Sequence, residues 1–349
     1  MRILITGGAG FVGSNLAFAI RRAFPEAEIV CMDNLYRRGS ELNLPRLEKI
    51  GVQFHDGDVR EPGGFPPGGF DYMVECSAEP SVLAGQDGSP DYLFQTNLVG
   101  AYNCLEKARL WKSRFLFLST SRIYPIAPLE AHPWREEKTR FVWEDQGTVG
   151  LTSHGVSENL DLTGARSLYG FTKLAAEQLI EEYRNTYQLK AITNRCGVIA
   201  GPWQFGKVDQ GVASLWVLSH YYERPLSYIG YGGTGKQVRD FLHVDDLCEL
   251  LVEQLQNFDQ WDGWAGNVAG GLGNSASLCE LTAICEEVIG KKIPIKAIPA
   301  NRPSDLRLFL GDCAKLHART AWRPRRNIRT LVRDLHQWVN EHSADLARL

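Results

Sequence analysis

The sequence predicts an α/β fold in which a doubly wound, mostly parallel sheet is followed by a smaller carboxyl-terminal lobe. Strand and helix patterns alternate over the first 125 residues, and this regularity weakens beyond residue 200. Such alternation is typical of parallel sheets, because each crossover between parallel strands needs a helix. At 349 residues the chain is long enough for one large or two smaller domains. We place the first domain at residues 1–200 and the second at 201–349, with part of the second crossing back to the sheet.

The chain opens with a strand, a glycine turn and a helix. Arg2–Thr6 is a short apolar run rich in β-branched residues, which predicts a buried parallel strand. Glycines follow, and Phe11–Arg22 continues at helical spacing. Glycines allow close approach of the backbone to a ligand, and a helix N-terminus attracts phosphate. We therefore expect a pyrophosphate to bind at Gly7, Gly10, Phe11, Val12 and Gly13.

The second strand ends in an acidic residue. Glu28–Met32 reads as a strand that leads to Asp33, twenty residues after Gly13. A carboxylate at this distance binds the ribose of NAD and disfavours the 2′-phosphorylated cofactor. Arg37 and Arg38 favour the 2′-phosphorylated cofactor instead. For the whole strand–turn–helix unit, the alternative is an ordinary βα turn that binds no cofactor. We interpret the unit as a Rossmann-like NAD site that includes Asp33 and Asn34.

The following strands place more polar residues at strand ends. We expect Leu35–Gly51 to be mostly helical and the third strand to lead to Asp58. The Asp58 carboxylate either accepts a hydrogen bond from the adenine amino group or belongs to a simple turn. Strands are predicted at 52–54, 72–77 and 114–119, and a long helix at 91–111. The predicted cofactor contacts in this part are Asp58, Val59, Ser77, Ala78, Asn97 and Ser119.

The second half of the chain is less regular. Residues 126–167 are rich in proline and charge and have no clear period, so we expect a long loop that is functional or disordered. Leu168–Tyr187 is a strong amphipathic helix, and Ala191–Val198 reads as a strand. Helices are also expected at 208–222, 246–258, 277–289 and 328–341, and a short strand at 226–229.

Composition limits the partners of the protein. A net charge of −3 gives no reason to expect nucleic acid or an anionic membrane as a partner. The chain begins directly with a strand, and its apolar runs are too short for a membrane helix, so we expect no signal peptide and a cytoplasmic location. The eight cysteines lie in apolar runs without zinc-site spacing, so we expect reduced core thiols and no metal site.

The strongest catalytic candidates are Tyr169 and Lys173, which lie four residues apart on one helix face. A phenol with a pKa near 10 is a poor base at neutral pH, and a nearby ammonium stabilises its phenolate. This spacing also occurs by chance in many helices. Its weight increases because Ser119, Thr120 and Ser121 end a strand, where ligands bind in such sheets.

In combination these motifs resemble the extended short-chain dehydrogenase/reductase family of NAD-dependent nucleotide-sugar enzymes. That family has the spacing of Gly7, Gly10 and Gly13, and its catalytic hydroxyl lies four residues before a tyrosine, here Tyr124. The resemblance implies that Tyr169 is the base, that Thr120 hydrogen-bonds the reacting oxygen, and that Lys173 binds the nicotinamide ribose and lowers the pKa of the tyrosine.

The resemblance runs nearly end to end and implies a nucleotide-sugar substrate. Arg195–Pro202 resembles the family's Arg-x-x-x-x-x-Gly-Pro turn. Arg239 lies in an Arg-Asp-x-x-His segment and Arg302 in a later Arg-x-x-Asp segment, which assigns both to the diphosphate; a surface salt bridge is the alternative for each. Further stretches resemble the branch that inverts carbon 2 of a CDP-linked hexose or deoxyhexose, and they add Gln204 and Gln210 to the substrate contacts.

Two departures from the family pattern bear on specificity. Where the family often has His-x-Ala-Ala, this chain has Glu75-Cys76-Ser77-Ala78, so the identity of the sugar is not predicted. Where dehydratases have an Asp-Glu pair, this chain has Ser121-Arg122. We therefore expect an epimerase, with another nucleotide-sugar 4-epimerase or a reductase as the alternative. A non-catalytic, NAD-binding regulatory protein is the alternative of another class. Many relatives dimerise through the helices at 91–111 and 168–187, so we expect a homodimer.

Overall fold

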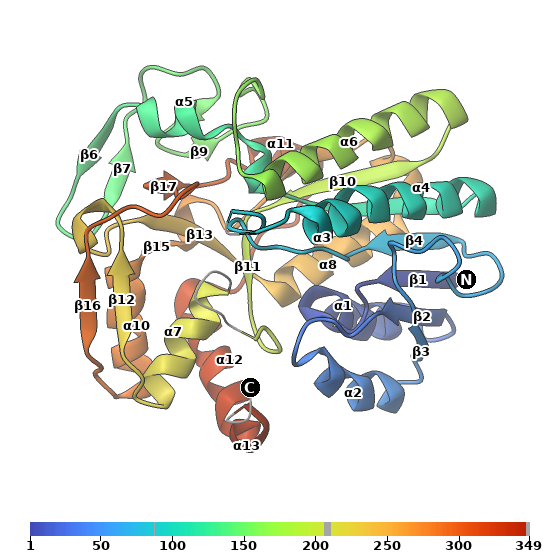
Figure 1. The fold of residues 1–349 in the computed structure, drawn as a ribbon, viewed down its shortest axis with the longest axis horizontal. Helices are drawn as coiled ribbons and strands as arrows, with labels where there is room; N and C mark the ends of the chain where they lie inside the picture. Colours follow the sequence, from blue (N-terminus) through green and yellow to red (C-terminus); the bar gives the residue numbers. More distant parts are fainter. Residues whose placement is uncertain (87, 206–210, 347–349) are drawn as a thin grey trace. The chain divides into compact units, whose positions relative to one another are not determined.

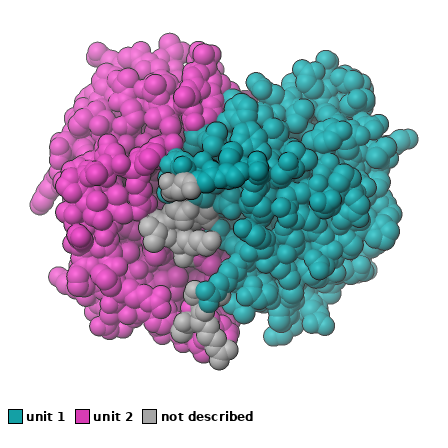
Figure 2. All heavy atoms as spheres, in the orientation of Figure 1, with its two compact units in different colours: residues 1–123, 167–195, 248–265 teal, residues 124–166, 196–247, 266–349 magenta. Residues whose placement is uncertain are grey.

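The computed structural model describes residues 1–86, 88–205 and 211–346. The chain forms two compact units, each assembled from three separate stretches (Figure 2). Unit 1 contains residues 1–123, 167–195 and 248–265, and unit 2 contains 124–166, 196–247 and 266–349. Besides the boundary expected near residue 200, residues 124–166 join the second unit. Residues 248–265 return to the first unit, and a crossing back to the sheet was expected for this part of the chain.

A seven-stranded sheet organises unit 1, in the order β14-β10-β5-β4-β1-β2-β3. The ladders from β3 through β2, β1 and β4 to β5 are all parallel. The order reverses between β1 and β4, and in such sheets the carboxyl ends at this reversal are the usual ligand site. The predicted doubly wound, Rossmann-like α/β fold is confirmed. The strands are β1 (Arg2–Thr6), β2 (Glu28–Asp33), β3 (Gln53–Asp56), β4 (Tyr72–Glu75), β5 (Arg114–Thr120), β10 (Ala191–Cys196) and β14 (Ala265–Val268).

Helices cover both faces of this sheet, with α1 and α2 on one face and α4 and α6 on the other (Figure 1). The predicted helix at 91–111 consists of α3, a π-helical turn at Gln95–Val99 and α4. The expected helix at 35–51 is reduced to a 3₁₀ turn at Ser40–Asn43 and α2. The helices are α1 (Phe11–Ala23), α2 (Leu44–Lys49), α3 (Asp91–Phe94), α4 (Gly100–Trp111), α6 (Leu168–Tyr187), α8 (Val244–Gln256) and α9 (Phe258–Trp261).

One large hydrophobic cluster of unit 1 lies between the sheet and the pair α4 and α6. Phe115 and Phe117 of β5 are fully buried and pack in one cluster with Leu105 of α4 and Ala176 and Ile180 of α6. Helix α6 starts where the sequence predicts, because the Ser167 side chain accepts a hydrogen bond from the backbone N–H of Gly170 at 3.1 Å. This cap and this packing fix the helix that carries Tyr169 and Lys173.

Unit 2 combines short strands with a helical layer. Helices α7, α10 and α12 pack on one another around buried Trp216, Leu281 and Leu335. One small sheet contains β11 (Val198–Ala200), β13 (Val238–His243), β15 (Ser275–Ser277) and β17 (Leu308–Phe309), and a second pairs β12 (Leu226–Ile229) with β16 (Ile295–Ile298). The helices are α7 (Val212–Tyr221), α10 (Leu278–Ile289), α11 (Ala314–Arg319), α12 (Ile328–Glu341) and α13 (Ser343–Leu346). None of the described helices is long and apolar enough to cross a membrane.

The expectation of an unpatterned loop at 126–167 was wrong. This stretch holds α5 (Ile126–Ala131), the antiparallel pair β6 (Trp134–Glu136) and β7 (Phe141–Trp143), and a second pair, β8 (Leu151–Thr152) and β9 (Gly155–Val156). Strands of two or three residues are too short to show a period in the sequence. Phe141, Trp143 and Val156 are nevertheless buried and belong to the interior.

Candidate active site

The glycine turn between β1 and α1 is packed so closely that side chains cannot fit. Gly7 has φ +64°, and a Cβ on it would lie 2.8 Å from the backbone of Cys76 and Ser77. A Cβ on Gly13 would lie 2.4 Å from the carbonyl oxygen of Gly7. The turn therefore brings the backbone N–H groups at the start of α1 to the carboxyl end of β1, where the sequence predicts a pyrophosphate.

Asp33 at the end of β2 lies beside this turn, as the spacing predicts. Its carboxylate accepts from the backbone N–H of Ala9 at 3.1 Å and of Leu35 at 2.9 Å. Burial raises the pKa of Asp33, although these backbone hydrogen bonds lower it in part. The backbone N–H groups of Gly10 and Asn34 also act on this carboxylate, which therefore lies at the turn where the ribose of NAD is expected.

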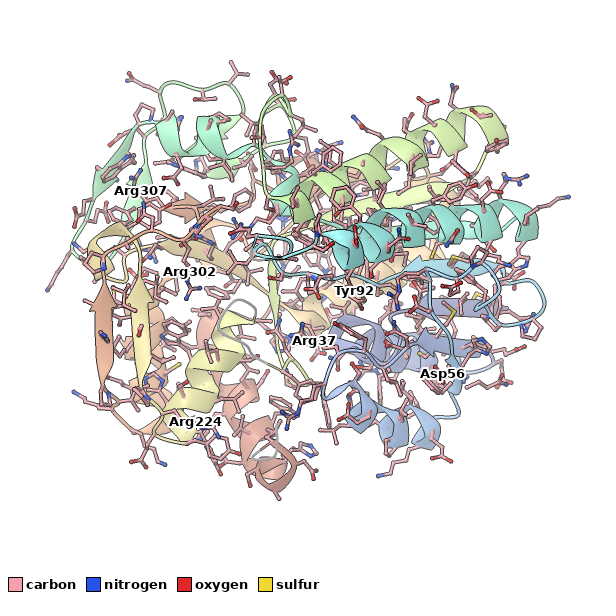
Figure 3. The ribbon with its side chains drawn as sticks, viewed as in Figure 1. Arg37, Asp56, Tyr92, Arg224, Arg302 and Arg307 are labelled. Atoms are coloured by element: carbon pink, nitrogen blue, oxygen red, sulfur yellow. The ribbon has the colours of Figure 1, made fainter. Side chains whose placement is uncertain are left out.

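Asp58 lies beyond the end of β3 with its carboxylate already well bonded. Asn34 donates to it at 2.8 Å, and the Arg60 guanidinium donates from Nη2 at 2.6 Å and from Nε at 3.0 Å. Burial raises the pKa of Asp58, but these bonds outweigh it and lower the pKa to about 2. Arg60 also lies 5.0 Å from the ring centroid of Tyr92, the α3 residue labelled in Figure 3. A contact from Asp58 to adenine therefore requires Arg60 to give up part of this bonding, and that contact stays a prediction.

Lys173 of α6 points into the sheet at the ends of β4 and β5. Its Nζ donates to the carbonyl oxygen of Leu118 at 3.0 Å and lies 4.5 Å from the ring centroid of Phe117. The Oε2 atom of Glu75 is 3.6 Å away. Both side chains are almost completely buried, with exposed fractions of 4% for Lys173 and 2% for Glu75. The sequence reasoning assigned no role to Glu75; the signal that could have found it was a glutamate ending a buried strand.

The hydroxyl candidates at the end of β5 differ in their bonding. Ser119 donates from Oγ to Oε1 of Glu177 at 2.5 Å, and Glu177 also receives a forked pair of bonds from Arg195. Thr120 is 8% exposed, and its Oγ1 accepts from the backbone N–H of Arg122 at 3.2 Å. The Thr120 hydroxyl therefore keeps its own hydrogen as a donor for a substrate oxygen, whereas that of Ser119 is committed to Glu177.

Asn97, itself a predicted cofactor contact, bonds to the segment after β4 that contains the predicted contacts Ser77 and Ala78. Its side-chain amide accepts from the N–H of Glu79 at 2.8 Å and donates to the carbonyl of Glu79 and to Thr172. Thr172 in turn donates to the carbonyl oxygen of Tyr169 at 2.8 Å. Asn97 thus ties the segment that contains Ser77 and Ala78 to the helix that carries Tyr169. Val59 is buried, and its methyl carbon Cγ2 would lie 2.7 Å from a Cβ on Gly100.

In unit 2, the two arginines assigned to a diphosphate both form hydrogen bonds to Asp305. Arg239 of β13 donates from Nη2 to Oδ1 of Asp305 at 2.8 Å and to the carbonyl of Leu306 at 2.6 Å. Arg302, labelled in Figure 3, accepts at its carbonyl from the N–H of Asp305 at 3.3 Å. An anion at Arg239 must therefore share the guanidinium with Asp305.

The remaining substrate candidates are glutamines. The Gln204 amide donates to the carbonyl of Ile199 at 2.9 Å and accepts from the Ser214 hydroxyl at 3.0 Å, so it links β11 to α7. Gln210 lies outside the described residues. Within the described ranges, no group of three or more His, Cys, Asp or Glu side chains is arranged to hold a metal ion.

Comparison with known proteins agrees with this geometry. Residues 3–269 match the model of the NAD dependent epimerase/dehydratase family. The chain belongs to this family. CDP-paratose 2-epimerase of Salmonella typhi is 31% identical, with 97% of this chain and 99% of that protein covered. The dTDP-glucose 4,6-dehydratase of Escherichia coli is 26% identical, with 97% and 92% covered. The Thermus thermophilus UDP-glucose 4-epimerase, solved in complex with NAD, is 26% identical with a TM-score of 0.74, covering 97% of this chain and 99% of that one.

Membership of the NAD dependent epimerase/dehydratase family confirms the predicted resemblance, the enzymatic activity and NAD as the cofactor. The described residues fit NAD, because the close-packed glycine turn places the N-terminus of α1 at the carboxyl end of β1, and the Asp33 carboxylate lies beside this turn. The roles of the individual site residues remain predictions.

Proposed function

We propose that the protein epimerises a nucleotide-diphosphate sugar, and specifically inverts carbon 2 of a CDP-linked hexose or deoxyhexose. The observation that supports this most is the 31% identity to a CDP-paratose 2-epimerase over nearly the full length of both chains. Ser121 and Arg122 stand where dehydratases of the resembling family carry an Asp-Glu pair, so the acid that assists loss of water is replaced. This favours inversion over dehydration.

The proposed cycle assigns one task to each predicted catalytic residue and to the two predicted diphosphate-binding arginines. NAD, when bound, supplies reversible hydride exchange with the reacting carbon. Tyr169 takes the proton of the hydroxyl on that carbon, and Thr120 donates a hydrogen bond to the same oxygen. The Lys173 ammonium stabilises the phenolate of Tyr169. The flat keto-sugar turns over while Arg239 and Arg302 bind its diphosphate, and Tyr169 returns the proton to the oxygen on the inverted carbon.

The test is NMR of the sugar ring protons after incubation with CDP-, UDP-, GDP- and dTDP-hexoses in deuterated water. We expect a new diastereomer from a CDP-sugar, without deuterium at the inverted carbon, because the same hydride returns. Deuterium at that carbon would contradict direct oxidation there. Inversion at carbon 4 would instead support the 4-epimerase alternative, and steady accumulation of NADH would support a reductase. No reaction with any sugar would leave the regulatory NAD-binding alternative.

We also propose a cytoplasmic homodimer that associates through α4 and α6. The eight cysteines all lie in the described part of the chain and form no disulfide there, which suits a reducing compartment. Large apolar side chains on these helices are exposed, namely Tyr102, Leu110, Phe171 and Tyr187. Light scattering should give twice the chain mass, and Leu110→Lys should shift the protein toward the monomer. A monomeric wild type would contradict the proposal.

A further inference from the structure

Glu75 is a buried carboxylate at the point where the sheet order reverses. It is the last residue of β4, next to β1. Its Oε2 has no hydrogen-bond partner among the described residues. Removing a carboxylate from water is costly unless it is paired with an opposite charge. The closest cation therefore determines whether the Glu75 carboxylate is charged or protonated.

That cation is Lys173, whose Nζ lies 3.6 Å from Oε2 of Glu75. The other titratable groups near Glu75 are the thiols of Cys76 and of Cys104 on α4, whose pKa values are raised by burial and, to a lesser extent, by the charge of Glu75. The Lys173 ammonium donates to a carbonyl oxygen of β5 and lies near an aromatic ring of the same strand. Among its described contacts, only Glu75 carries a full negative charge. Each member of the pair is therefore the other's main electrostatic partner.

We infer that Glu75 is a positioning residue that holds the charged Lys173 at the ends of β4 and β5, and that the charge on Glu75 sets the acidic limb of the pH–rate profile. This inference rests on the proposed role of Lys173 in epimerisation.

The direction of the pH effect follows from burial. Burial raises the pKa of Glu75, while Lys173 and the backbone N–H of Ser77 lower it in part. Glu75 therefore gains a proton at a higher pH than an ordinary glutamate as the solution is acidified. The neutral acid holds Lys173 only weakly, so turnover should fall on the acidic side while the sugar still binds.

The first test compares Glu75→Gln with wild type across pH, using the sugar that the wild-type protein inverts. We expect kcat at neutral pH to fall about 100-fold, as for a misplaced catalytic group, with the KM of the sugar within about twofold of wild type. The acidic limb should disappear, and Glu75→Asp should restore part of kcat with the limb present. Glu106→Gln is the control: Glu106 lies on α4 of unit 1, its carboxylate accepts hydrogen bonds from Tyr183 and Arg109, and the pH profile of the variant should match wild type. An unchanged kcat with an unchanged acidic limb in Glu75→Gln would overturn the inference.

A second test needs no substrate and separates this inference from the proposed function. Urea unfolding is measured for Glu75→Gln, Lys173→Met and the double variant, which form a double-mutant cycle. We expect Glu75→Gln to lower the unfolding midpoint clearly in the wild-type background, because it leaves a buried ammonium unpaired, and much less in the Lys173→Met background. Equal losses in both backgrounds would contradict the pair, whatever sugar the protein acts on.

Discussion

The two units carry predicted ligand sites of different kinds. In unit 1 the site is made largely of backbone: the glycine turn excludes any Cβ, and Asp33 is fixed by backbone N–H groups. In unit 2 the site is made of side chains, and Arg239 is bonded to Asp305 and to a carbonyl. A backbone site tolerates few sequences and is therefore visible as a motif. A side-chain site can change specificity by a single substitution.

The sharpest test of the unit 1 assignment is Tyr169→Phe. The variant should lose about 10²–10⁴-fold in turnover, the usual contribution of a positioned proton transfer, and should still bind NAD because the glycine turn is untouched. Steady-state kinetics and calorimetric NAD titration measure the two effects separately. Near-wild-type turnover would remove Tyr169 from the mechanism.

A pH measurement addresses the stability of unit 2. Burial raises the pKa of Asp240 to about 6, although backbone N–H groups of Gly311 and Gly271 lower it in part. Between about pH 4 and 6 the folded chain then holds a proton at Asp240 that the unfolded chain has lost, so this residue's contribution to stability falls as the pH rises, by at most about 3 kcal/mol. Urea unfolding at several pH values should show this slope in wild type relative to Asp240→Asn. Parallel curves for the two proteins would contradict it.

Gly13→Ala tests whether the unit 1 site depends on backbone packing. The added methyl would meet the Gly7 carbonyl oxygen at 2.4 Å and the Cα of Gly8 at 2.8 Å. We expect a loss of about 1–3 kcal/mol of stability, as for other overpacked sites, together with weaker NAD binding. Thermal unfolding and NAD titration provide the measurements. Gly63→Ala, where a Cβ would have no neighbour within 4 Å, is the control and should match wild type.

Arg239→Lys tests the side-chain site of unit 2. Lysine keeps the charge and loses the forked donor geometry, so we expect the KM of the nucleotide sugar to rise about tenfold, equal to about 1.4 kcal/mol, without a change in NAD binding. Arg224→Lys, an exposed arginine of the same unit that lies over Tyr222, should leave KM unchanged. Equal effects of the two substitutions would argue against a specific diphosphate contact at Arg239.

Local patterns predicted much of unit 1. The bounds of β1 and α6 match the expected ranges, and Asp33 lies beside the glycine turn as its spacing implies. Contacts between residues distant in sequence were not predictable. Asp305 follows Arg239 by 66 residues, and no pattern in the chain links them. Strand β14 is also absent from the prediction, because the four residues Ala265–Val268 include a glycine and an asparagine and show no alternation.

The discontinuous unit 1 has a consequence for the growing polypeptide. Strand β5, with the sequence RFLFLST, gains its neighbour β10 only after residues 124–166 have been added, and unit 1 is complete only at residue 265. At about 5–20 residues per second, residues 124–196, up to the end of β10, take roughly 4–15 s to synthesise. During that interval the nascent chain carries an unpaired, phenylalanine-rich edge strand, which is a template for aggregation. Ribosome-associated chaperones should therefore influence the yield of this protein more than that of a chain whose sheet closes in sequence order.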